Sequence, residues 1–74
     1  MVETALTNQI RKLRFEHGEM TQKQLAELTG CTRQTINAIE AAKYAPSLEL
    51  AFKIAGVFGL IVDDVFFFAD KGKG

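Results

Sequence analysis

The chain has 74 residues, and its nine basic and nine acidic side chains give a formal net charge of zero. Hydrophobic residues make up 47% of it and charged residues 24%, which is typical of one soluble globular domain spanning residues 1–74. A core this small excludes a large enzyme fold with a deep pocket. Because the charge is balanced, any contact with nucleic acid must come from locally placed basic residues.

The cellular compartment is indicated by what the sequence lacks. Its single cysteine, Cys31, cannot form an internal disulfide and has no companion metal ligand, which favours a reducing compartment. The longest apolar runs are far shorter than the roughly 20 residues of a membrane span. Residues 1–4 do not have the basic and apolar regions of a signal peptide. We therefore expect a cytoplasmic protein with no membrane contact, no metal and no cofactor.

Apolar residues recur at intervals of three and four, which predicts helices and gives almost no strand signal. The first helix is expected within residues 4–17, where Leu6, Ile10 and Leu13 share one face. Gly18 ends this helix.

Two short helices are expected next. Thr21 and Gln24 match a capping box, in which each side chain accepts a backbone N–H of the other residue. Gly30 ends the second helix after about two turns, and Thr32 is the N-cap of the third.

The C-terminal third predicts two more helices and a tail. Ser47 caps a fourth helix that Gly59 ends, and Asp63 is expected to cap a short fifth helix through Phe68. Residues 70–74 are expected to form a disordered tail.

Residues 22–41 have the dimensions of a helix-turn-helix, two helices joined by a tight turn. Ala26 lies where two helices would cross closely, and Gly30 suits a turn position with positive φ. Ile36 and Ile39 would hold the second helix of the pair against the first, leaving its other face free.

From residue 10 to residue 66 the sequence resembles the Xre/Cro–CI family of helix-turn-helix regulators, especially its very small stand-alone members. The resemblance is carried by residues 10–14, 21–26, 32–40, 46–48 and 52–55. It implies an all-α, compact five-helix domain of the lambda-repressor type, with the helix-turn-helix at helices two and three. In this family the third helix enters the major groove of double-stranded DNA, usually as a homodimer. The chain departs from the family at Ala41 and Ala42, where a glycine is common, and at Val62, which replaces a Ser or Thr cap.

The resemblance also assigns roles to individual positions. Base contacts fall on Arg33, Gln34, Asn37 and Ala38; phosphate contacts fall on Gln22, Lys23, Lys43 and Tyr44; a structural ion pair falls on Arg14 and Glu40. The chemistry of the four base-contacting types agrees with this assignment. Arginine binds guanine bidentately, glutamine and asparagine bind adenine, and alanine can touch a thymine methyl group.

An aromatic run near the C-terminus is the most ambiguous feature. Three adjacent aromatic residues cannot all face one core from a helix, so at least one should project outward. The segment either wraps the small core or forms a subunit contact. We favour a homodimer contact made by Val65, Phe66, Phe67 and Phe68.

The sequence shows no nucleophile–base pair, metal cluster or phosphate-binding loop, so we do not expect an enzyme. Our hypothesis is a sequence-specific DNA-binding transcriptional regulator, acting as a repressor on a near-palindromic operator. One alternative is the antitoxin of a toxin–antitoxin pair or the controller of a restriction–modification system, with a toxin or other protein as a further partner. Another is a protein-interaction module that uses the fold without binding DNA.

Overall fold

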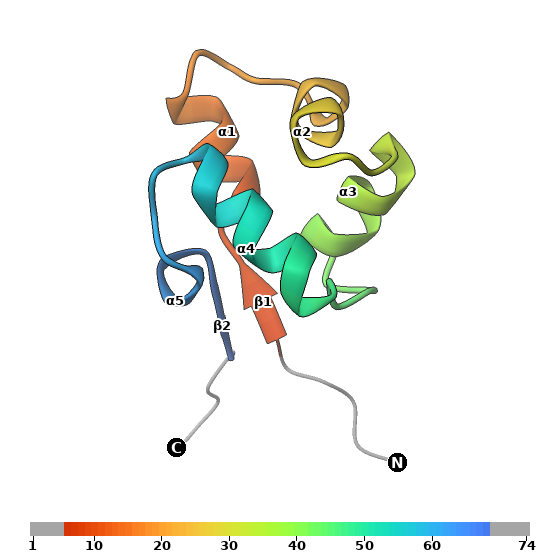
Figure 1. Ribbon diagram of the computed structural model, residues 1–74, viewed down its shortest axis with the longest axis vertical. Coiled ribbons are helices and arrows are strands. Elements are labelled where there is room, and N and C mark those ends of the chain that lie inside the picture. The colour runs from red at the N-terminus through yellow and green to blue at the C-terminus, as the bar shows by residue number, and fades with distance from the viewer. Residues whose placement is uncertain (1–5, 69–74) are drawn as a thin grey trace.

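The computed structural model describes residues 6–68. Its elements in chain order are β1 (Leu6–Asn8), α1 (Ile10–Glu16), α2 (Gln22–Thr29), α3 (Arg33–Glu40), α4 (Leu48–Val57), α5 (Val62–Val65) and β2 (Phe66–Phe68). Figure 1 shows α4 in the middle of the molecule, with α1, α2 and α3 around it and the two strands at the end away from α2. The compact five-helix fold expected from the resemblance is confirmed.

A short antiparallel ribbon at the two ends of the described chain was not expected. Strand β1 pairs with β2, so that Leu6 lies opposite Phe68 and Asn8 opposite Phe66. The first helix consequently begins only at Ile10, and the last ends at Val65 instead of continuing through Phe68. Three residues are too few for an alternating pattern to be visible in a sequence, which is why only helices were predicted here. The expected tail, residues 70–74, lies outside the described residues.

The helix starts follow the capping residues, with one correction. Thr21, Thr32 and Ser47 each accept a backbone N–H of their own helix, and Thr21 and Gln24 form the full capping box. Helix α5, however, begins after Ile61, without a side-chain cap. Asp63 is therefore not the cap that we expected: it lies in the first turn, where a carboxylate favours the positive end of the helix.

One hydrophobic core joins the five helices and the ribbon. Its fully buried large side chains are Ile10, Leu25, Ile36, Ile39, Ile54 and Val65. Phe66 is also buried, at 7% exposure, whereas Phe67 and Phe68 are 44% and 72% exposed. Phe66, the first residue of β2, faces inward and lines a small cavity with Leu6 and Ile39. Val65 and Phe66 are thus part of the protomer's own core, which corrects their assignment to a subunit contact.

Among residues 6–68, no helix combines the length and the apolar character needed to cross a bilayer. Within the same range, no three His, Cys, Asp or Glu side chains gather as metal ligands would.

Candidate nucleic-acid interface

Helices α2 and α3 and the turn between them form the structure that the sequence pattern indicated. Gly30 ends α2 in the left-handed conformation, with φ 76°, and the next N–H, of Cys31, donates to Ala26 O at 3.0 Å. A residue with a Cβ is strained at this φ, so glycine permits the tight turn. Thr32 then starts α3 by accepting the N–H of Thr35. These features define a helix-turn-helix.

The outer face of α3 carries the side chains to which we assigned base contacts. Arg33, Gln34 and Asn37 are exposed, and Ala38 is half-buried. Within the described part of the chain, neither Arg33 nor Gln34 makes a side-chain hydrogen bond, so both are free to bind a ligand. The opposite face of α3 buries Ile36 and Ile39 completely, which fixes the helix from behind.

An ion pair ties α1 to the end of α3. Arg14 Nε donates to Glu40 Oε2 at 2.6 Å, and Nη2 donates to Oε1 at 3.0 Å. The third nitrogen, Nη1, donates to Met20 O at 2.7 Å. The two side chains are only 14% and 9% exposed, so solvent screens the pair weakly. The Arg14 guanidinium therefore connects α1, the loop before α2, and α3 through these three hydrogen bonds.

Gln22, at the start of α2, extends this network toward the outer face of α3. Its Nε2 donates to Glu40 Oε1 and to Asn37 Oδ1, both at 3.2 Å. Asn37 is thus linked to the ion pair through Gln22. From the sequence, Asn37 and the ion pair had been assigned separate roles. The network lines an open hollow of about 410 Å³, to which Arg11 and Ala41 also belong.

The loop after α3 begins with a Schellman turn built on Ala42. The Ala42 N–H donates to Ile39 O at 2.9 Å and the Lys43 N–H to Ala38 O at 3.0 Å. Ala42 has φ 60°, so the alanine occupies the left-handed position at which the family commonly has glycine. The turn is therefore formed despite this departure, and it leaves Lys43 and Tyr44 exposed beside the end of α3.

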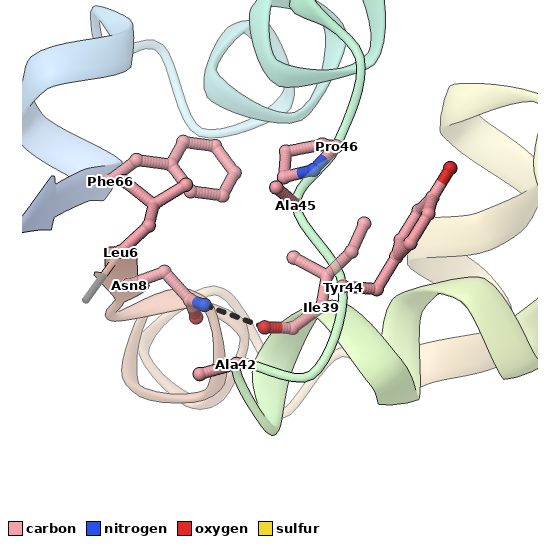
Figure 2. A pocket seen from close by; sticks show the side chains of 8 residues that line it. All are labelled: Leu6, Asn8, Ile39, Ala42, Tyr44, Ala45, Pro46 and Phe66. Carbon is pink, nitrogen blue, oxygen red and sulfur yellow. Dashed lines mark hydrogen bonds between the residues drawn. The ribbon is translucent and has the colours of Figure 1, made fainter. Parts of the chain in front are cut away.

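Asn8, which the sequence analysis missed, connects the ribbon to α3. Its Nδ2 donates to Ile39 O at 2.8 Å, while its Oδ1 accepts the N–H of Ile10 at 3.1 Å. Figure 2 shows this side chain reaching the end of α3 beside a cavity of only about 10 Å³, while Tyr44 extends away from it. An asparagine just before a helix is a visible capping signal. Its bond to Ile39, however, depends on the tertiary structure.

Local charge favours an anionic partner over the face formed by α2 and α3. Between residues 21 and 43, Lys23, Arg33 and Lys43 are exposed, and so is the acid Glu27. Glu40 is neutralised by its ion pair with Arg14. Arg11, a second residue missed from the sequence, adds an exposed guanidinium at the hollow.

Comparison with known proteins agrees with this architecture. A helix-turn-helix family model, HTH_3, matches residues 10–64. An HTH-type transcriptional regulator of Methanocaldococcus jannaschii, MJ0272, is 48% identical over 88% of this chain and 97% of its own length. YgzD of Bacillus subtilis, also described as an HTH-type transcriptional regulator, is 41% identical over 89% of this chain and 98% of its own.

A solved structure shows the same fold at lower identity. The crystal structure of a Bacteroides fragilis protein superposes with a TM-score of 0.71 at 24% identity, over 84% of this chain and 98% of that one. The chain belongs to the HTH_3 helix-turn-helix family of Xre/Cro–CI type, within its small HTH-type transcriptional regulators. Members of this family are regulators and not enzymes.

Proposed function

We propose that the protein is a sequence-specific DNA-binding repressor that places the outer face of α3 in the major groove of a near-palindromic operator. The observation that carries this proposal is the exposed pair Arg33 and Gln34, which have no hydrogen-bonding partner among the described residues. They project from a helix held by fully buried isoleucines. Donors projecting from a helix that is fixed from behind suit the recognition of base edges, because little backbone freedom is then lost on binding.

The flanking cations suit the phosphates on either side of the groove. Lys23 lies in the first turn of α2, and Lys43 and Tyr44 lie in the loop after α3. Arg11, at the hollow between α1 and α3, is a further candidate. Contacts to phosphate position the protein without reading sequence. Occupation of the operator by such a domain is sufficient to exclude other proteins from it, which is why we favour repression.

Substitutions on and beside α3 should separate the side chains that recognise bases from those that contact phosphates. Selection of bound duplexes from a random pool is expected to enrich one half-site. Arg33→Ala and Gln34→Ala should each lose about 1–3 kcal/mol on that half-site and relax the preference at one or two base pairs. Lys43→Ala should weaken binding to all sequences alike and lower the salt slope by about one.

These measurements need matched folding controls. Circular dichroism melting should give near wild-type curves for all three variants, because each side chain is exposed. If nothing is enriched at low salt, the DNA-binding proposal is wrong. If Arg33→Ala and Gln34→Ala keep the wild-type preference, α3 is not the reading helix.

We further propose that the protein binds as a homodimer through the exposed part of the C-terminal aromatic run. One small domain contacts only a few base pairs, so specificity calls for two half-sites about one helical turn apart. Phe67 and Phe68 are exposed on β2, which pairs with β1 at the end of the molecule away from α2 (Figure 1). A contact made by these two side chains would not use Arg33 or Gln34, which project from α3.

Phe67→Asp is expected to shift the protein toward monomer, because a carboxylate in the contact would be buried without a partner. Sedimentation velocity over a range of concentrations measures this shift, and circular dichroism checks that helicity is kept. The control is Phe15→Asp, which alters a phenylalanine on α1 that is 69% exposed, against 44% for Phe67. A wild-type protein that stays monomeric at high micromolar concentration, with and without DNA, contradicts the dimer proposal.

A further inference from the structure

We infer that Asn37 presents only hydrogen-bond donors to DNA and therefore selects guanine over adenine at one base pair of each half-site. This inference rests on the proposed function, because it concerns how α3 recognises a base. It also changes the expectation from residue type alone, in which asparagine pairs with adenine through its amide N–H and carbonyl together.

The orientation of the Asn37 amide is set by the Glu40 carboxylate, to which Asn37 is linked through the side chain of Gln22. Glu40 accepts hydrogen bonds and donates none, so the atom of Gln22 facing it at 3.2 Å must be the amide nitrogen. That same nitrogen lies 3.2 Å from the Asn37 amide. Because a nitrogen of this kind only donates, Asn37 must turn its carbonyl oxygen toward it.

At the Arg14 end of the network, the donor and acceptor roles are equally determined. Arg14 has only donors, and two of its nitrogens are bound to Glu40 while the third is bound to Met20 O. Glu40 therefore cannot turn toward Gln22 as anything but an acceptor. Arg14 and Glu40 have hydrogen-bonding roles that cannot be exchanged, and they set which ends of the Gln22 and Asn37 amides face each other. The result is that the Asn37 oxygen faces α2 and the NH₂ group is left for a ligand.

An NH₂ group without an accompanying acceptor distinguishes the two purines. In the major groove guanine offers two acceptors, N7 and O6, to which the NH₂ can donate. Adenine offers N7 beside its own N6 amino group, so a donor would face a donor. Asn37 is exposed on α3, three residues beyond Gln34 and one turn from Arg33, on the face that we propose enters the groove.

The test compares guanine and adenine at the base pair that Asn37 contacts. That pair is identified in the selected half-site as the one whose preference is lost in Asn37→Ala. Wild-type protein is expected to bind the guanine duplex about tenfold more tightly than the adenine duplex, a typical effect of one base contact. Gln22→Met removes the donor that holds the Asn37 oxygen while keeping the length of the side chain. Asn37 can then rotate and pair with adenine, and the two affinities should agree to within about threefold.

Lys23→Met is the matched control for Gln22→Met. It removes a proposed phosphate contact at the neighbouring residue of α2, which makes no side-chain bond to Asn37 among the described residues. It should therefore weaken both duplexes alike and leave the tenfold ratio unchanged. A purely phosphate-binding or structural role of Gln22 would weaken both duplexes equally and would also leave the ratio unchanged. The ratio therefore reports the orientation of Asn37 and not the overall affinity.

The outcomes are separable from those that test the proposed function. An enriched half-site with guanine at the Asn37 pair, lost selectivity in Gln22→Met and kept selectivity in Lys23→Met support the inference. Adenine at that pair, no relaxed pair in Asn37→Ala, or an unchanged ratio in Gln22→Met overturns it while leaving DNA reading by Arg33 and Gln34 intact. Failure to enrich any sequence overturns both.

Discussion

Ile36→Ala is expected to lower the free energy of unfolding by about 2–5 kcal/mol, because it leaves a cavity between α3 and the rest of the core. Ile36 is fully buried on the inner face of α3, so no solvent can fill the space that the lost side-chain atoms leave. A domain of this length has roughly 4–11 kcal/mol to lose. The variant should therefore be near the limit of folding, and its melting temperature should fall by at least about 8 °C.

Leu28→Ala is the matched control for this substitution. Leu28 is 62% exposed on α2, so it loses a side chain of the same size without opening a cavity. Its melting temperature should stay within a few degrees of that of the wild type, since exposed substitutions change stability by about 0.5 kcal/mol or less. Equal melting curves for both variants would show that α3 does not depend on Ile36. DNA binding by Ile36→Ala should be lost only in proportion to the unfolded fraction.

Arg14→Met is expected to cost about 3 kcal/mol, which corresponds to roughly 12–24 °C in melting temperature. The substitution keeps an apolar stem of similar length but leaves the Glu40 carboxylate, 9% exposed, with only the Gln22 amide as a partner. Met20 O also loses its donor. Arg11→Met is the control: it removes an exposed arginine from the same helix, and it should change stability by less than about 0.5 kcal/mol.

The double variant Arg14→Met with Glu40→Met separates the ion pair from simple packing. Replacing both charges removes the unpaired carboxylate, so much of the lost stability should return. If the double variant instead loses the sum of the free energies of unfolding that the two single variants lose, Arg14 and Glu40 do not act as a coupled ion pair. The double variant should still lose selectivity at the Asn37 base pair, because the carboxylate that orients Gln22 is gone.

Much of the helix-turn-helix could be predicted from the sequence because its signals are local. Thr21, Thr32 and Ser47 start helices through hydrogen bonds that span three residues, and Gly30 ends one through its own φ. Such features depend on neighbours in the chain, so a linear pattern contains them. The spacing of Ile36 and Ile39 likewise determines which face of α3 is buried and which carries Arg33 and Gln34.

The ribbon and the inward turn of its C-terminal strand were decided by tertiary structure. Leu6–Asn8 and Phe66–Phe68 become strands only because the two ends of the described chain meet. A run of three phenylalanines indicates apolar burial but does not indicate which ring is buried. That choice is made by the direction of the chain leaving α5, which places Phe66 in the core and Phe67 and Phe68 toward solvent.

The sequence by itself determined the class of protein, the five helices and the residues on the outer face of α3. Only the folded molecule decided how those residues are held. Asn8 reaches Ile39, and Gln22 reaches both Glu40 and Asn37, from separate elements of the chain. Side-chain hydrogen bonds between distant elements require positions correct to a few tenths of an ångström, which no periodicity contains. The direction in which Asn37 presents its donors is therefore a property of the packing of α1, α2 and α3.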